Sequence, residues 1–319
     1  MQNKIITLNN KKISINKKPY IIAEIGSNFN QNFMKEKKLI FEAKRCGVDA
    51  VKFQLFKSEK LYPDNKKMYK LFKSIELNPN WIPKLKKFAE KYKLDFLCSC
   101  FDLDSAKILN KNKIIMHKIA SSETENLSLS KFLIKTKKPI LLSTGMSDIK
   151  DVKNILSLTK KYQNDKIILM QCTSTYPPND SDVNLNVLKT YKKFGHILGF
   201  SDHTFDETAS LTAVGLGVRV FEKHFTLNRN DKGPDHIISI NPIEMKNYVT
   251  KIHKAFIQLG TSEKDLTKIE KKTCRRNGIY FSKFLKKGTK IRKKFLIIKT
   301  PAIGVRARDI RKFIGKTLN

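Results

Sequence analysis

Two histidines stand at positions where their side chains could do chemistry together. His203 ends a short apolar run, and His224 ends the next one, with a single helix-length segment between them. Parallel strands joined by a helix point the same way, so both imidazoles are expected at one edge of a sheet. Two neutral imidazoles flanked by Asp202 and Glu222 would form half of a divalent metal site. The alternative is that each histidine only caps its strand through a hydrogen bond.

Two lysines form a second chemical signal. Lys52 and Lys118 each lie inside an otherwise apolar run, and a lysine within a strand is rarely buried without a partner. Two lysines that converge with several hydroxyl groups make a pocket for a dianion such as a phosphate ester. The alternative is that each lysine pairs with a neighbouring glutamate or extends into solvent.

The elements that must position these groups alternate along the chain. Segments with helical periodicity separate eight apolar runs, which are Tyr20–Ile25, Ala50–Phe53, Phe96–Cys98, Ile114–Ile119, Ile140–Leu142, Ile167–Gln171, Ile197–Phe200 and Val218–Phe221. This alternation predicts an α/β fold, the (β/α)8 or TIM barrel. A doubly wound open sheet is the alternative, but Gly26–Asn30 is not the glycine-rich phosphate loop that such a sheet normally carries after its first strand.

Three segments follow from this pattern. Residues 1–260 are predicted to form the barrel domain, with a short N-terminal hairpin within residues 4–20 and a closing helix over Pro242–Leu259. Residues 261–274 are charged and aperiodic, so we interpret them as a linker. Residues 275–319 read as a small β-rich module. Its length is marginal for an independent core, so we expect it to pack on the barrel or on a second subunit.

If the barrel prediction is right, the active site lies at the carboxyl ends of the strands. Each predicted strand or the loop after it supplies at least one polar side chain there. The candidates are Glu24, Lys52, Gln54, Ser99, Lys118, Ser121, Glu123, Ser143, Ser174, Tyr176, Ser201, His203, His224 and Asp235.

Composition limits the partners of the chain. The 64 basic and 29 acidic residues give a formal net charge of +35, which invites a nucleic-acid interpretation. The lysines, however, are spread over nearly all predicted helices and loops, and the sequence has no arginine-rich arm, zinc-finger spacing or aromatic-basic RNA motif. A general compositional bias explains the charge at least as well, so we expect no specific nucleic-acid binding.

Cysteine usage and hydropathy indicate the compartment. The five cysteines are an odd number and lie mostly in apolar runs, which favours reduced thiols in a cytoplasmic protein. No stretch approaches the roughly 20 apolar residues of a membrane helix, and the N-terminus has no signal-like apolar core. We therefore expect no membrane association.

The candidate residues lie in segments that resemble the sialic acid synthase family, in family order through the predicted barrel. The segments are Ile22–Asn28, Val51–Gln54, Lys118–Glu123, Leu142–Met146, Cys172–Thr173 with Tyr176–Pro177, Ser201–Thr204, Glu222–Thr226 and Gly233–Asp235. The tail from Arg275 to Lys316 is similar to the start of the family's antifreeze-like (SAF) domain. The resemblance thus covers nearly the full chain.

The resemblance implies a function and an assembly. The family condenses phosphoenolpyruvate with an N-acylated hexosamine, such as N-acetylmannosamine or a diacetamido-trideoxyhexose, to a nine-carbon 2-keto sugar acid, and phosphate is released. It implies that His203 and His224 hold a divalent metal, manganese by preference, with magnesium or cobalt as alternatives. It also implies a homodimer in which the small domain covers the partner's active site.

Roles for single residues are carried over by motif. Phosphoenolpyruvate would be held by Lys52, Lys118, Ser99, Ser121, Ser143 and Ser201, and the sugar by Glu123, Tyr176 and Asp235. Glu24 would act near the reacting carbons as a base for water or for a sugar hydroxyl. Lys118 would stabilise charge that develops on the phosphate. Gln54 and Ser174 complete the predicted substrate contacts.

Some positions depart from the family pattern. Phe29 and Gln31 replace the His and Gly of an Asn-His-x-Gly segment, and Cys100 replaces the Pro of Thr-Pro-Phe. Thr300 replaces the arginine that the family uses on the N-acyl group, for which Arg306 or Arg308 could substitute. The chain also stops before the family's small domain usually ends, and an incomplete lid would admit water. The alternative function is therefore a degenerate, non-catalytic member that binds a sugar or a partner.

Overall fold

The computed structural model describes residues 4–273 and 275–319. They belong to two compact units, Met1–Gly260 and Thr261–Asn319. Of the five cysteines, Cys46, Cys98, Cys100 and Cys172 are free and buried, while Cys274 lies outside the described residues. None of the helices in the described ranges combines the length and the apolar character that crossing a bilayer requires.

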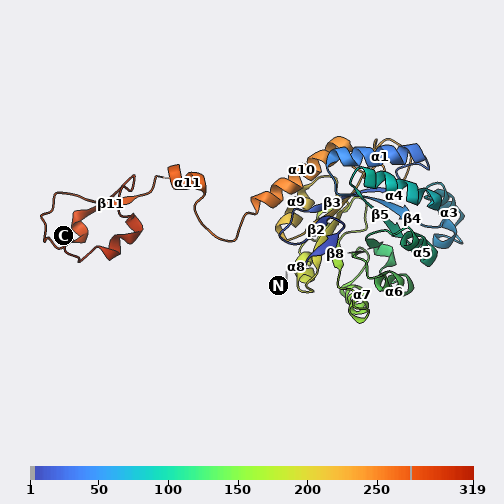
Figure 1. Ribbon diagram of the computed structural model, residues 1–319, viewed down its shortest axis with the longest axis horizontal. Coiled ribbons are helices and arrows are strands. Elements are labelled where there is room, and N and C mark those ends of the chain that lie inside the picture. Colours follow the sequence, from blue (N-terminus) through green and yellow to red (C-terminus); the bar gives the residue numbers. More distant parts are fainter. Residues whose placement is uncertain (1–3, 274) are drawn as a thin grey trace. The chain divides into compact units, whose positions relative to one another are not determined.

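The first unit is a closed barrel of eight parallel strands in the order β10-β3-β4-β5-β6-β7-β8-β9. The strands are β3 (Tyr20–Gly26), β4 (Ala50–Leu55), β5 (Asp95–Cys100), β6 (His117–Ile119), β7 (Ile140–Ser143), β8 (Ile167–Gln171), β9 (Ile197–Asp202) and β10 (Val220–His224). Helices surround the strands (Figure 1). The predicted (β/α)8 fold is confirmed.

Several helices begin where a polar side chain caps them. Asn32, Asp102, Asp148 and Asn241 each accept hydrogen bonds from the first-turn amides of the helix that follows. The helices of this unit are α1 (Phe33–Cys46), α2 (Ser58–Leu61), α3 (Lys66–Lys73), α4 (Ile82–Lys91), α5 (Leu103–Lys111), α6 (Leu127–Lys135), α7 (Ile149–Lys161), α8 (Val187–Lys192), α9 (Thr208–Gly215) and α10 (Pro242–Gln258).

Only β8 has the bounds of its predicted run, and the other strands differ from theirs by one to three residues at one or both ends. β6 is shorter, because the chain bends at residues 115 and 116 before the strand pairs with its neighbours. β9 and β10 both extend further toward their carboxyl ends, where Glu222 pairs with Ser201 and Lys223 with Asp202. Backbone pairing continues there although the side chains become polar, so apolar periodicity ends before the strands do.

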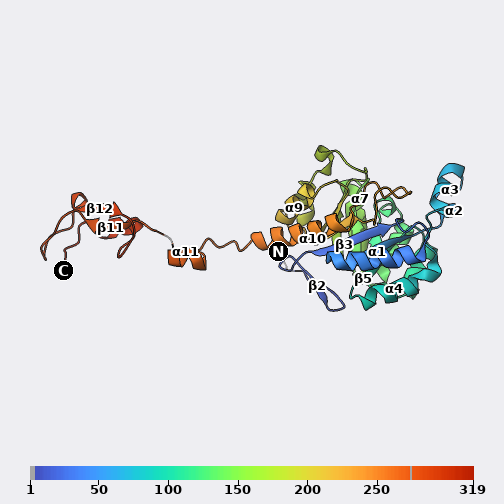
Figure 2. The ribbon, with the colours of Figure 1, turned by 90° about the horizontal axis from the view of Figure 1, so that it is seen from above.

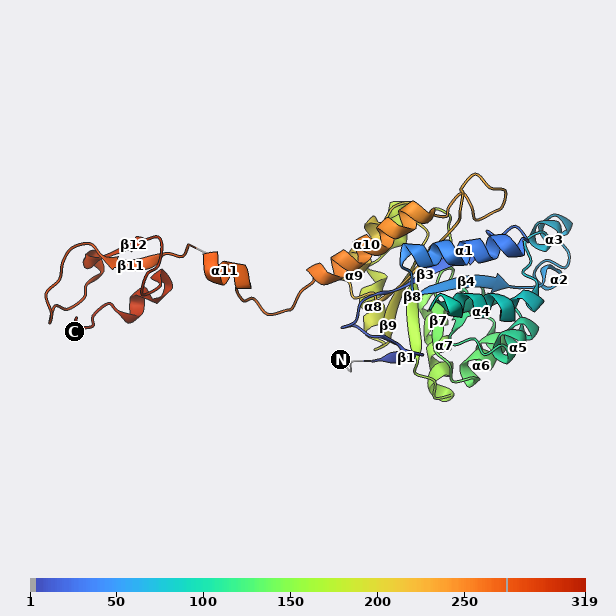
Figure 3. The same cartoon turned by 45° about the horizontal axis from the view of Figure 1, so that its top comes forward.

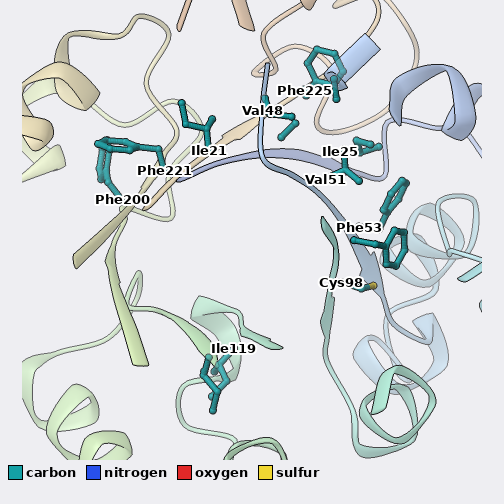
Figure 4. Packing of buried hydrophobic residues seen from close by; sticks show 14 of the residues in the cluster. Ile21, Ile25, Val48, Val51, Phe53, Cys98, Ile119, Phe200, Phe221 and Phe225 are labelled. Carbon is teal, nitrogen blue, oxygen red and sulfur yellow. The ribbon is translucent and has the colours of Figure 1, made fainter. Parts of the chain in front are cut away.

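The strands contribute to two hydrophobic clusters, one outside the barrel and one inside it. Outward-facing side chains such as Phe53, Phe200 and Phe221 pack beneath the helices, as Figure 4 shows. Inward-facing side chains near the strand starts form a second cluster with Ile6, Leu8 and Ile13 of the N-terminal hairpin, β1 (Ile6–Leu8) and β2 (Lys11–Ile13) (Figures 2 and 3). The hairpin therefore closes the amino-terminal end of the barrel interior, which can open only at the other end.

The second unit is a small β-rich fold. β11 (Gly278–Phe281) pairs antiparallel with β12 (Leu296–Lys299), and a short helix, α11 (Lys268–Thr273), precedes them within the segment interpreted as a linker. Among the residues of this unit whose burial is described, Gly278 and Ile291 are the buried ones. A Cβ on Gly278 would lie 2.7 Å from Ala302 Cα, so the tightest packing in this unit requires glycine.

The barrel unit contains one carboxylic acid in an unfavourable environment. Glu36 on α1 is fully buried, and neither of its carboxyl oxygens has a hydrogen-bond partner among the described residues. Burial raises the pKa of Glu36 to about 9. The folded protein therefore keeps a proton that the unfolded chain releases at much lower pH, and folding loses stability as the pH rises between the two values.

Glu36→Gln should remove this pH dependence. The parent protein loses about 1.4 kcal/mol of folding stability per pH unit in this range, whereas the variant does not. The difference in unfolding free energy, variant minus parent, should therefore be up to about 4 kcal/mol larger at pH 8 than at pH 5. Urea denaturation at both pH values measures it. Glu90→Gln, at an exposed position of α4, is the control and should show no such difference. Equal effects of Glu36→Gln at the two pH values would contradict the prediction.

Candidate active site

A cavity of about 380 Å³ lies at the carboxyl ends of the strands, and all eight strands or the loops after them line it. Most of the predicted site residues meet there. They are Glu24, Lys52, Gln54, Ser99, Lys118, Ser121, Ser143, Ser174, Tyr176, Ser201, His203, His224 and Asp235. Glu123, predicted to contact the sugar, is absent from this lining. Its buried carboxylate instead accepts hydrogen bonds from Asn126 Nδ2 at 2.9 Å and Ser122 Oγ at 3.1 Å.

Four buried charges form the floor of the cavity. Lys52 Nζ lies 2.9 Å from Glu24 Oε2 and 3.6 Å from Glu222 Oε2. Lys118 Nζ lies 2.8 Å from Glu222 Oε1. The lysines are thus paired with glutamates, as one interpretation expected. They also line the cavity, as an anion-binding pocket requires. Glu222 was expected at the strand ends, beside a histidine, and was assigned no role in substrate binding. Its position two residues before His224, on the same face of β10, was the available signal for a site residue.

The environments of the two lysines differ. Burial opposes the charge of both, but Glu222 and Glu24 together raise the pKa of Lys52. For Lys118, burial prevails over its contact with Glu222 and lowers its pKa. Glu222 is itself buried, yet Lys118 and Lys52 hold its pKa well below the usual range. Lys52 is therefore the more persistent cation, and Lys118 releases a proton more readily.

Hydroxyl and thiol groups surround this floor. Ser99 accepts a hydrogen bond from Lys52 at 3.0 Å, and Ser201 donates one to Glu222 at 3.0 Å. The Gly145 amide lies 3.1 Å from both Ser121 Oγ and Cys172 Sγ. Cys172 thus lines the cavity although it was not predicted to. A Cβ on Gly145 would lie 2.3 Å from Ser174 Oγ, so the serines can converge here only around glycine.

The histidine pair fits a metal site. The two ring centroids are 5.7 Å apart. His203 Nδ1 donates to the Thr173 carbonyl at 2.7 Å, which leaves Nε2 as a lone-pair donor. His224 Nδ1 is buried and has no hydrogen-bond partner among the described residues. Burial and the neighbouring His224 lower the pKa of His203 to about 3, so this imidazole is neutral, as a ligand must be.

Within the described ranges, no group of three or more His, Cys, Asp or Glu side chains could hold a metal ion. A divalent ion on the two histidines would therefore take its other ligands from water or substrate, as catalytic sites with open positions do. The Tyr176 ring lies 4.2 Å from the His203 ring and 5.9 Å from that of His224, so it covers the pair.

A buried ion pair supports the histidines from behind. Lys223 Nζ lies 3.2 Å from Asp202 Oδ2, and both side chains are almost fully buried. Asp202 also accepts hydrogen bonds from the Thr204 amide at 2.9 Å and from Ser210 Oγ at 2.7 Å. Because Asp202 precedes His203 and Lys223 precedes His224, this pair holds the ends of β9 and β10 together.

The loop after β10 is anchored to the loop after β3. Ser27 Oγ donates to Asp235 at 3.1 Å. His236 is buried and contacts Asn30 Oδ1 at 2.9 Å and Thr226 Oγ1 at 2.7 Å. His236 is thus a supporting residue of the loop and does not face solvent.

Three of the departures from the family pattern lie outside the cavity lining. Phe29 is fully buried in the core, with its ring 6.4 Å from that of Phe53. Cys100 is buried in the same hydrophobic cluster. Gln31 binds the Lys73 carbonyl at 2.8 Å. These replacements change the packing around the site and not the groups that line it.

Comparison with known proteins agrees with this geometry. Residues 39–264 match the model described as the NeuB family. The chain belongs to this family. It is 34% identical to the N,N'-diacetyllegionaminic acid synthase of Legionella pneumophila, over 94% of this chain and 90% of the relative. It is 37% identical to the uncharacterized protein MJ1065 of Methanocaldococcus jannaschii, again over 94% of this chain and 90% of the relative.

A solved structure shows the same fold. The N-acetylneuraminic acid (sialic acid) synthetase of Leptospira borgpetersenii superposes with a TM-score of 0.81 at 30% identity, and the match covers 84% of this chain and 94% of that protein. The resemblance to sialic acid synthases inferred from the motifs is confirmed at the level of the NeuB family. An SAF domain at the carboxyl end stays a prediction.

Glu222→Gln should destabilise this NeuB-family protein at neutral pH. The change leaves Lys118 and part of the Lys52 charge buried without a counter-charge, which costs about 3 kcal/mol or more. Because the pKa of Glu222 is depressed in the folded state, its contribution exists above the ordinary glutamate pKa and is lost as the pH falls. The unfolding free energies of variant and parent, measured by urea denaturation, should therefore differ clearly at pH 7 and by less at pH 3. Glu125→Gln, at an exposed position, is the control. Equal stability of variant and parent at pH 7 would sink this prediction.

Proposed function

We propose that this protein condenses phosphoenolpyruvate with an N-acylated hexosamine to a nine-carbon 2-keto sugar acid and releases phosphate. As a NeuB-family chain with synthase relatives, it is an enzyme of this transferase type. The observation that carries the specific proposal is a single cavity in which two buried lysines and several serines lie beside a histidine pair. The lysines and serines suit a dianion such as phosphoenolpyruvate. The histidine pair suits the carbonyl group of the sugar.

The floor of the cavity is the proposed site for phosphoenolpyruvate. Lys52 and Lys118 supply positive charge for the phosphate and carboxylate, and Ser99, Ser121, Ser143 and Ser201 supply hydrogen bonds. Glu24 and Glu222 hold both ammonium groups in place before the substrate arrives. Such preorganised donors stabilise charge as it develops, without reorganisation during the reaction.

His203 and His224 are the proposed holders of a divalent ion, for which manganese is our first candidate. When bound, such an ion polarises the aldehyde of the open-chain sugar. The neutral His203 ring and the unpartnered His224 Nδ1 support this assignment. Tyr176, which covers the two rings, limits the access of bulk water to them.

The proposed reaction needs one base and one source of positive charge. The methylene carbon of phosphoenolpyruvate bonds to the aldehyde carbon of the sugar. Water then adds to the carbon that carries the phosphate, and the bond between that carbon and the phosphate oxygen breaks. Glu24, whose carboxylate is held by Gln54 at 2.8 Å and by Lys52 at 2.9 Å, accepts a proton from the water or from a sugar hydroxyl. Lys118, with its lowered pKa, stabilises or protonates the departing phosphate.

Phosphate release should require phosphoenolpyruvate, an N-acylated hexosamine and a divalent metal together. Colorimetric phosphate assays with manganese measure it, and electron paramagnetic resonance measures manganese binding separately. His203→Ala should abolish release and weaken manganese binding. His253→Ala is the control, because His253 lies on α10, outside the cavity lining, and its ring contacts the Pro19 carbonyl at 3.4 Å.

Each failure has a distinct meaning. Phosphate release that persists in His203→Ala would show that the reaction does not need a metal ion held by this histidine. No release with any sugar, from folded protein that binds manganese, would favour the degenerate member that binds a sugar or a partner without turnover.

We also propose that the chain works as a homodimer in which the second unit of one copy covers the partner's active site. The support is indirect: the second unit buries few of its own side chains and exposes large apolar ones, among them Phe284 and Ile303, and such surfaces mark interaction sites. Light scattering should give twice the chain mass of 36.9 kDa. A monomeric mass across the working concentration range would contradict the dimer.

A further inference from the structure

A second cavity, of about 360 Å³, lies at the amino-terminal ends of β9 and β10. The segments on both sides of the N-terminal hairpin, the loop between α8 and β9, and the loop between α9 and β10 line it. It shares no lining residue with the candidate active site, which lies at the carboxyl ends of the same strands. The two cavities are therefore separate.

Three cations line this second cavity. They are Lys4, Lys192 and Arg219, and within the described ranges no Asp or Glu side chain joins them in the lining. Lys4 Nζ lies 3.2 Å from His196 Nδ1. Burial lowers the pKa of His196 to about 4, so this ring is neutral and accepts a hydrogen bond from the lysine. Asp165 lines the neighbouring cavity that shares His196. Positive charge thus gathers here without a carboxylate in the lining.

Arg219 is a buried cation without a counter-charge. It is 5% exposed, and burial lowers its pKa with no carboxylate acting against it. Nε donates to the Ile15 carbonyl at 2.7 Å, and Nη1 donates to the Val214 and Val218 carbonyls at 3.2 and 2.7 Å. The Phe256 ring lies 4.9 Å from Cζ. The two N–H groups of Nη2 have no acceptor among the described residues. Because an unpaired buried charge is costly, an anion in the cavity would be stabilised.

The rest of the lining is mainly aliphatic. Ile15, Leu198 and Leu216 contribute to it, and Ile15 is 39% exposed although it is a large apolar residue. Leu198 belongs to the cluster outside the barrel wall, and Leu216 packs against that cluster. The cavity therefore lies outside the barrel interior that the hairpin closes. An apolar body placed here would cover these side chains and be stabilised by their burial.

We infer that this cavity binds a small organic anion, with its anionic group at Arg219 and Lys4 and its apolar body against Ile15 and Leu216. The lining disfavours two simpler ligands. An inorganic anion would leave the aliphatic side chains uncovered, and a neutral apolar molecule would leave Arg219 without a counter-charge. The volume is within the range of small-molecule sites. The inference is independent of the proposed function, because the two cavities share no residue.

Fluorescence titration of the full chain with 1-anilinonaphthalene-8-sulfonate, an aromatic anion, tests this inference. The parent protein should bind the dye saturably, and 4-phenylbutyrate should displace it. The uncharged alcohol 4-phenylbutanol has the same carbon skeleton, so it should displace the dye at least about 10-fold more weakly if the charge is recognised.

Two variants locate the site. Lys4→Glu brings a carboxylate to the cavity and should weaken dye binding at least about 10-fold. Lys12→Glu is the matched control, because Lys12 is an exposed residue of the same hairpin and lies outside the lining. At about 0.15 M salt it should change the affinity by less than about 2-fold. Ile15→Ser, at an exposed position, should fold like the parent and weaken binding roughly 5-fold, since apolar contact is lost.

Several results would overturn the inference. Equal weakening by Lys4→Glu and Lys12→Glu would show that the dye responds only to the overall charge of the chain. Equal displacement by the alcohol and the acid would show that no anion is recognised. Binding that is unaffected by both Lys4→Glu and Ile15→Ser would place the dye elsewhere, and a parent protein that does not bind it saturably would exclude the site.

Discussion

The interior of the barrel depends on burying four charges at once. Two lysines and two glutamates lie within the strands, with side chains no more than about 6% exposed. Each would be costly alone, because an isolated charge loses its hydration without compensation. They are tolerated because Glu222 contacts both lysines and Glu24 contacts one. The eight strands around them must therefore hold a narrow geometry, and this geometry leaves the ammonium groups facing the cavity.

The rest of the barrel is arranged around that requirement. Inward-facing positions are apolar near the strand starts and become polar two residues later. Examples are Ile22 and Glu24, Ala50 and Lys52, Leu97 and Ser99, Met116 and Lys118, and Val220 and Glu222. The N-terminal hairpin seals the apolar end. Water thus reaches the interior only from the polar end, where the charges and the histidines lie.

Support for the site comes from residues that do not line it. The Asp202–Lys223 pair holds two strand ends from outside the cavity, and His236 anchors the loop that carries Asp235. Such supporting contacts set the orientation of reactive groups within fractions of an ångström. Their chemistry is ordinary, and only their position makes them part of the site.

The sequence by itself determined the barrel, since eight apolar runs alternating with helical segments leave few other folds. It also determined most of the residues at the cavity, because the carboxyl ends of parallel strands must meet. Only the tertiary structure decided which of them touch. Glu222 proved central because it reaches lysines on β4 and β6, far away in sequence. Glu123 turned to Asn126, and Phe72 and Phe101 met through Phe56. Periodicity shows which face of a strand or helix a residue occupies, whereas partners across the barrel are set by closure and register, which no local pattern encodes.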